Sequence, residues 1–179
     1  LPINQFYTCE IDYNSPEKLY GGLQDNGVVR TTTGNTNDWN AIVGGDGFYV
    51  LVDSSNSNYS YGESQYGALE RTSNGWASAA GATNGISNTS RKNWNTPVAF
   101  NPLNTRSLYY GAEKIYKSVN RAQQWSAISG DLTNGFVNLG ITYATITTIV
   151  VSPLDSNIIV SGTDDGNVWV TINTGVGWT

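Results

Sequence analysis

An internal repeat constrains this chain more than any other feature of its sequence. Four times the chain runs through an apolar strand, a turn rich in Asn, Asp and Pro, a second strand ending near glycine, a polar hairpin loop and a third strand. If Gly21, Gly62, Gly111 and Gly162 are taken as equivalent, the period runs from 41 to 51 residues. Such a period predicts a supersecondary unit that buries its faces against further copies of itself.

The composition agrees with short strands rather than helices. Aromatic residues make up 12% of the chain and charged residues only 13%, with abundant turn-forming residues. Because four-stranded blades of a β-propeller have this repeat length, we predict an all-β β-propeller of four-stranded antiparallel blades. About four blades are present, as part of a seven-bladed ring. Their approximate bounds are 5–43, 48–92, 96–129 and 146–179.

Each third strand is followed by a degenerate form of the Asp-box, Ser/Thr-x-Asp-x-Gly-x-x-Trp. Ser118–Trp125 and Thr171–Trp178 fit this pattern, whereas Thr31–Trp39 is stretched and Thr72–Trp76 is shortened. We expect the hydroxyl or Asx side chain to cap the turn, glycine to take the positive φ, and Trp to pack between blades.

Four further stretches carry a resemblance to a known family: Leu19–Gly27, Gly44–Phe48, Asn93–Pro97 and Gly162–Gly166. Together they resemble large bacterial BNR-repeat proteins, labelled "glycosyl hydrolase" or sortilin-type propellers. Related architectures include xyloglucanase-type glycosidases, sialidases and the sortilin ectodomain. The resemblance therefore implies a secreted propeller but no single activity, since one fold serves several functions.

Charge and residue usage exclude several classes of partner. With nine Lys and Arg and a net charge of −5, the chain lacks the clustered cations that nucleic acid requires. Cys9 is the only cysteine and histidine is absent, so we expect no disulfide within the chain, no transition-metal site and no cofactor. The sequence does not exclude a calcium site, although it contains no EF-hand or RTX loop. No apolar run reaches membrane-spanning length.

The same composition favours export. A chain poor in charge and rich in Asn, Ser and Thr is typical of extracellular or periplasmic proteins. Thr179 follows directly on the last Asp-box Trp, where a fourth strand is due, so we expect the remaining blades of a longer chain as a partner.

Blade topology places the polar loops. In an up-and-down blade, the loop between second and third strands and the loop between blades emerge on one face, which commonly binds ligands. This face is expected to collect two carboxylates, Asp46 and Glu63, and a set of ligand-binding side chains. The latter are Gln24, Asp25, Asn26, Gln65, Asn93, Trp94, Asn95, Asp164 and Asp165.

Two functions remain open on these residues. The first is a module that binds glycan or an extracellular protein or peptide. The alternative is a glycoside hydrolase with Asp46 and Glu63 as paired carboxylates. Each residue also has a plain structural interpretation: Asp46 could cap a turn, and Trp94 could wedge between blades rather than stack on a sugar. A sialidase is disfavoured because this face has no arginine cluster.

Overall fold

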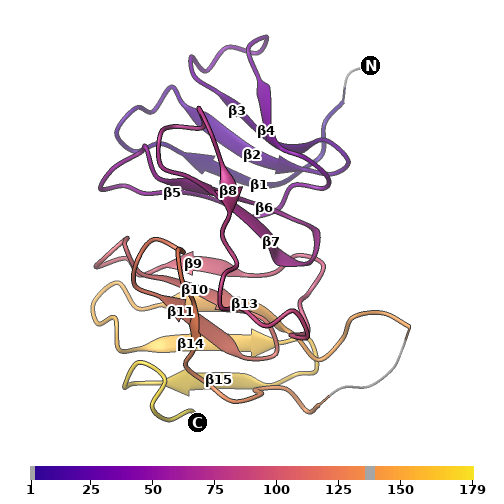
Figure 1. Ribbon diagram of the computed structural model, residues 1–179, viewed down its shortest axis with the longest axis vertical. Coiled ribbons are helices and arrows are strands. Elements are labelled where there is room, and N and C mark those ends of the chain that lie inside the picture. Colours follow the sequence, from indigo (N-terminus) through magenta and orange to yellow (C-terminus); the bar gives the residue numbers. More distant parts are fainter. Residues whose placement is uncertain (1–2, 136–139) are drawn as a thin grey trace. The chain divides into compact units, whose positions relative to one another are not determined.

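A computed structural model describes residues 3–135 and 140–179. The chain divides into two compact units, Leu1–Ala82 and Thr83–Thr179. Each unit holds two antiparallel sheets whose strands follow one another in chain order (Figure 1). The predicted class is confirmed: an all-β chain of propeller blades, with a single short 3-10 turn (η1, Gln65–Gly67) in the described part.

In the first unit, the sheets are β1–β4 and β5–β8. Their strands are β1 (Phe6–Ile11), β2 (Leu19–Leu23), β3 (Gly27–Thr31), β4 (Asn40–Val43), β5 (Val50–Val52), β6 (Ser60–Ser64), β7 (Ala68–Thr72) and β8 (Ala80–Gly81).

In the second unit, a four-stranded sheet is followed by a three-stranded one. Their strands are β9 (Val98–Phe100), β10 (Leu108–Gly111), β11 (Ile115–Ser118), β12 (Ser126–Ala127), β13 (Ile146–Val151), β14 (Ile159–Thr163) and β15 (Val168–Thr171). Thr179 and Val170 exchange both backbone hydrogen bonds, so the backbone at Thr179 is placed as a fourth strand would be.

One turn fixes the register of all four blades. The turn residue after each first strand donates its backbone N–H to the carbonyl six residues later. The four turn residues are Asp12, Asp53, Asn101 and Ser152.

Counting from these turns corrects the repeat alignment expected from sequence. The strand registers make Gly22, Gly111 and Gly162 equivalent, and the matching residue of the second blade is Glu63 rather than Gly62.

The loop after the third strand repeats atom for atom in three blades. Its leading hydroxyl accepts hydrogen bonds from backbone N–H groups two and four residues later, and an Asn amide oxygen accepts a third. The leading residues are Thr72, Ser118 and Thr171. The fifth loop residue has positive φ in each case, at 66° for Trp76, 59° for Ala122 and 90° for Gly175.

The loop after Thr72 is therefore not shortened, contrary to the sequence alignment. Trp76 occupies the position of Ala122 and Gly175, so only the Trp is displaced while the bonded loop keeps its length. In the first blade the loop is different: Thr31 and Thr33 donate to Asp38, and these hydrogen bonds hold the pKa of Asp38 below its usual value.

We expect Ser118→Ala to lower the free energy of unfolding by about 1–3 kcal/mol, because it strands N–H groups in a buried turn. Ser118 is 1% exposed and accepts from the N–H of Ala122 at 3.0 Å. Urea unfolding measures the change. Ser73→Ala, at an exposed residue of the equivalent loop, serves as control. Equal stability of the two variants would contradict this role.

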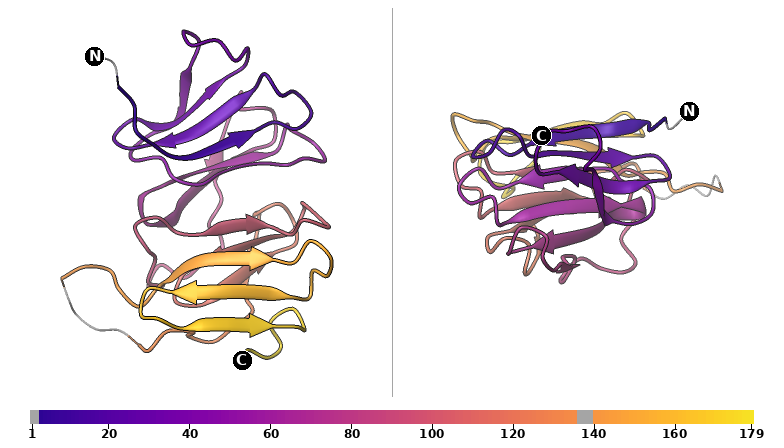
Figure 2. Two further views of the ribbon diagram at one scale, coloured as in Figure 1. Left: turned by 180° about the vertical axis from the view of Figure 1, so that it is seen from behind. Right: turned by 90° about the horizontal axis from the view of Figure 1, so that it is seen from above.

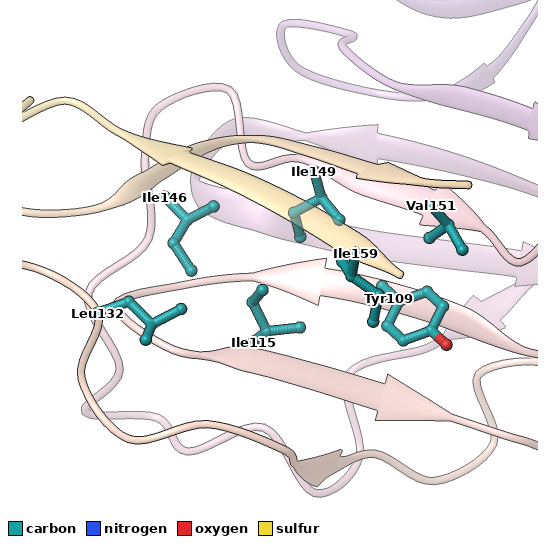
Figure 3. Packing of buried hydrophobic residues seen from close by; sticks show 7 residues of the cluster. All are labelled: Tyr109, Ile115, Leu132, Ile146, Ile149, Val151 and Ile159. Carbon is teal, nitrogen blue, oxygen red and sulfur yellow. The ribbon is translucent and has the colours of Figure 1, made fainter. Parts of the chain in front are cut away.

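Neighbouring sheets within each unit pack through equivalent positions. Tyr20 and Val28 of the first sheet share a core cluster with Val50 and Val52 of the second. In the other unit, Tyr109 and Ile115 share a cluster with Ile149 and Val151 (Figure 3). Tyr20 and Tyr109 hold equivalent positions in their sheets, as do Val28 and Ile115. On the sheets packed against them, Val50 corresponds to Ile149 and Val52 to Val151.

Candidate functional site

In the first unit, the expected loops do come together around Asp46. This residue precedes β5 and forms an isolated bridge with Gly27 of the preceding blade. Its carboxylate accepts from the backbone N–H of Asp25, and from Nε2 of Gln65 at 3.1 Å. Two of the predicted ligand-binding residues, Asp25 and Gln65, thus converge on the carboxylate of Asp46. Asp46 is half-buried and Asp25 exposed, so solvent reaches this cluster.

Glycines allow this close approach. A side chain at Gly22 or Gly47 would overlap backbone of the facing loop: Phe48 and Gly47 for the first, Gly27 for the second. The N–H of Gly47 donates to the carbonyl of Leu23 at 2.8 Å. The loop that carries Asp46 is therefore held against the β2–β3 hairpin by backbone contacts. Gln24 and Asn26 lie exposed at that hairpin.

Glu63 lies elsewhere than the exposed rim expected from sequence. Glu63 is fully buried, and its Oε2 accepts a hydrogen bond from the backbone N–H of Tyr49 at 3.3 Å. The reason is its register, because Glu63 stands where three other blades have glycine, next to the close-packed loop end. The pairing of Asp46 with Glu63 as catalytic acids stays a prediction, and the burial of Glu63 restricts its access to a substrate.

In the second unit, Asn93 and Asp164 meet over Thr145. Asp164 accepts from the N–H and the hydroxyl of Thr145, at 2.9 and 2.7 Å. The Asn93 amide donates to the Thr145 hydroxyl at 2.9 Å and to Asp164 at 3.5 Å. Trp94, beside Asn93 in sequence, is 43% exposed.

The remaining predicted residues of this unit serve local turns. Asp165 accepts from the N–H of Asn134 at 2.6 Å and from the amide of Asn167 at 3.0 Å. The N–H of Asn95 donates to Oδ1 of Asn93 at 3.2 Å, which fixes the turn before β9. These contacts favour a structural role for Asp165 and Asn95.

Sequence reasoning missed a charged cluster around Arg91. The Arg91 guanidinium donates to Asp131 at 2.7 Å, to Thr133 at 2.9 Å and to the carbonyl of Ala144 at 3.1 Å. Its backbone N–H donates to Glu113, a buried carboxylate in the β10–β11 hairpin. The sequence held one indication of this cluster. Glu113 lies in the hairpin between second and third strands, the same kind of loop that led us to select Asp25 and Asp164.

The Arg91 cluster should make stability depend on acid pH. Burial tends to raise the pKa of Asp131, but hydrogen bonds from Thr133 and Arg91 outweigh it and leave the pKa lowered. The ionised carboxylate thus stabilises the fold above the unfolded-state pKa, and this contribution is lost as pH falls through the folded-state value. Asp131→Asn should therefore lower the melting temperature at pH 7 and leave it nearly unchanged near pH 2. A difference independent of pH would contradict this.

Within residues 3–135 and 140–179, no group of three His, Cys, Asp or Glu side chains is placed to hold a metal ion. In the same ranges no helix has the length and apolarity needed to cross a membrane.

No family model matches the chain, and no curated protein matches its sequence. Among solved structures it is similar to an ancestral GH74 enzyme, with a TM-score of 0.76 and 16% identity over 98% of this chain. It is also similar to the GH74 enzyme of Niastella koreensis (TM-score 0.56, 18% identity, 97% of this chain) and to YCF48 from Cyanidioschyzon merolae (0.65, 13%, 100%).

These similarities define the class of the chain as β-propeller. At such identities they establish the fold alone. The chain spans 25% of the length of the ancestral enzyme, 38% of the Niastella enzyme and 56% of YCF48.

Proposed function

We propose that the chain is part of an exported Asp-box propeller that binds glycans through the hairpin ends of its blades. The observation that carries this proposal is the clustering of carboxylates, amides and an exposed Trp at those ends. Asn93 and Asp164 are joined there, and Trp94 adjoins Asn93. Sugars are bound by hydrogen bonds from carboxylates and amides and by stacking on aromatic rings.

The recurring loop bonds support the assignment to the Asp-box class. Asn takes the place of the box Asp in three blades, and its side-chain oxygen accepts the same N–H in each. The low charge of the chain supports export to an extracellular or periplasmic location, where a glycan or a protein partner is met.

We prefer binding to hydrolysis because neither of the two predicted catalytic carboxylates is free to act on a substrate. Asp46 is already engaged by the N–H of Asp25 and by Gln65, and Glu63 is buried. Retaining glycosidases need two carboxyl groups about 5 Å apart with access to the scissile bond. Glycoside hydrolysis stays the second candidate, because two of the similar structures are described as GH74 enzymes. A hydrolase of this kind would need a further catalytic carboxyl group from outside this chain.

Calorimetry with β-glucan and host-glycan oligosaccharides tests the proposal. We expect Trp94→Ala to weaken binding about tenfold or more, since it removes a surface on which a sugar ring stacks. Tyr13→Ala serves as control, because Tyr13 is 70% exposed in a turn between first and second strands. No binding across the panel, or equal loss in the control, would overturn the proposal. Release of reducing sugar that Glu63→Gln abolishes would favour hydrolysis.

A further inference from the structure

The turns between first and second strands and the loops after third strands lie at one end of each sheet. The hairpins between second and third strands lie at the other end, as the left view of Figure 2 shows for β13–β15. In the unit Thr83–Thr179 these turns and loops expose large aliphatic side chains, which we call the aliphatic tips. The aliphatic tips are Leu103 (57% exposed), Val119 (65%), Leu154 (92%), Ile172 (73%) and Val176 (88%).

The turns do not require leucine in order to form. In every blade the turn residue accepts, on its side chain, a hydrogen bond from the backbone N–H two residues later. The donor residues are Asn14, Ser55, Leu103 and Leu154, and all four are exposed. Because Asn and Ser form the same turn in the first unit, the fold does not explain the leucines of the second.

The loops after the third strands show the same contrast. The residue after the leading hydroxyl is Ser73 in the second blade, Val119 in the third and Ile172 in the fourth, and each is exposed. These three loops share one pattern of hydrogen bonds. Serine therefore serves the loop as well as valine or isoleucine does.

Hydrogen bonds join each turn of this unit to the loop beside it. Arg121 donates its backbone N–H to the carbonyl of Arg106 at 2.8 Å, and Thr174 donates to the carbonyl of Asn157 at 3.0 Å. Each of the two blades thus presents its aliphatic tips on one bonded pair of loops.

The aliphatic tips do not owe their exposure to a missing neighbour. The sheet β9–β12 shares a core with β13–β15, and Leu103 and Val119 of that blade are exposed nonetheless. A neighbouring sheet covers the face of a sheet, whereas these residues lie in the loops at its end. Exposed apolar groups of this kind mark sites of contact with a protein or a membrane.

The charges beside the aliphatic tips favour an anionic partner. The charged residues of these turns and loops are Arg106, Arg121 and Asp155, in a chain of net charge −5. Arg106 is exposed and Arg121 half-buried. The aliphatic tips therefore lie in a region with a small excess of positive charge on an acidic chain. Aliphatic side chains flanked by arginine suit the surface of a bilayer that contains anionic lipids.

We propose that the aliphatic tips insert into the surface of an anionic lipid bilayer, with Arg106 beside the lipid phosphates. A fluid bilayer accepts side chains that stand out singly, whereas a protein partner needs a fitted pocket for each. Leu and Val are also under-represented among the residues that carry the binding energy of protein–protein interfaces, and none of the tips is aromatic. Because the hairpin ends lie at the other end of the sheets, this contact leaves the proposed glycan site in water.

Flotation with lipid vesicles tests the proposal. Vesicles of equal parts phosphatidylglycerol and phosphatidylcholine should carry the chain up a density gradient, and vesicles of phosphatidylcholine alone should carry less of it. Salt should weaken binding to the anionic vesicles, because it screens the attraction between arginine and the lipid headgroups. Arg106→Gln should weaken that binding about fivefold.

A double variant, Leu154→Ser with Ile172→Ser, tests the aliphatic tips themselves. It gives the fourth blade the residues that the second blade has at these positions, Ser55 and Ser73, so we expect the fold to be kept. Circular dichroism checks the fold. Binding to the anionic vesicles should fall about tenfold or more, because two aliphatic side chains no longer leave water.

Val168→Ser is the matched control for the double variant. Val168 belongs to the same blade and is 71% exposed, but it lies in the strand β15 rather than in a loop at the end of the sheet. Its replacement should leave vesicle binding unchanged. Oligosaccharide affinity should be the same in the double variant and in the parent, so this proposal and the glycan-binding proposal can fail separately.

Three results would show that the aliphatic tips do not bind a bilayer. The first is no flotation with either kind of vesicle, in which case a protein partner covers the tips. The second is unchanged flotation of the double variant. The third is an equal loss in Val168→Ser, which would assign vesicle binding to the face of the sheet.

Discussion

Gly47→Ala should disrupt the Asp46 loop and destabilise the first unit by at least about 1–3 kcal/mol. A methyl group at Gly47 would overlap the carbonyl of Gly27, and its third nearest atom, the backbone nitrogen of Val28, would lie at 2.7 Å. All these atoms are backbone, so no side-chain rotation relieves the overlap. A displacement of the loop that relieves this overlap would also break the hydrogen bond from the backbone N–H of residue 47 to the carbonyl of Leu23.

Gly44→Ala is a closely matched control for this prediction. Gly44 lies in the same loop, but a Cβ there would meet nothing within 4 Å. The two variants are compared by urea unfolding and by the amide resonance of Asp25, which reports the hydrogen bond to Asp46. We expect Gly44→Ala to keep both properties. If Gly47→Ala did the same, the backbone contact would not hold the loop.

Trp125→Ala should cause the second large loss, about 3–5 kcal/mol, because it removes a large side chain from a packed core. Trp125 is 1% exposed, and its ring lies 5.7 Å from that of Tyr110 at a tilt of 59°. It is the last residue of the loop that begins at Ser118. Thermal and chemical unfolding measure the loss.

Trp94→Ala is the control for this prediction, because it removes an indole ring from the surface rather than from the core. Trp94 is 43% exposed, and its removal should change the free energy of unfolding by less than about 1 kcal/mol. Similar losses at the two positions would contradict the assignment of Trp125 to the core and Trp94 to the surface.

Periodic features could be predicted from the sequence because each depends on a few adjacent residues. The turns at Asp12 and Ser152 and the loop at Ser118 depend on local side-chain to backbone bonds, which short motifs encode. The expectation that hairpin and inter-blade loops share an end followed from strand alternation, and the contact of Asp25 with Asp46 agrees with it.

Register and long-range pairing were not predictable in the same way. A shift of one residue in the repeat alignment, from Gly62 to Glu63, changes a rim carboxylate into a buried one. The Arg91–Asp131 pair joins residues 40 apart in sequence, and no motif marks it. Trp76 misled the alignment because its spacing from Thr72 differs from that of Trp125 from Ser118, although the bonded loops are the same.

The most direct test of the account is to find which end of the blades an oligosaccharide touches. Titration of the ¹⁵N-labelled chain with the tightest-binding oligosaccharide should shift amide resonances around Asn93, Trp94 and Asp164. Resonances of the turns at Asp12 and Ser152 should stay in place. Shifts confined to those turns, or to the loops at Ser118 and Thr171, would contradict a ligand site at the hairpin ends.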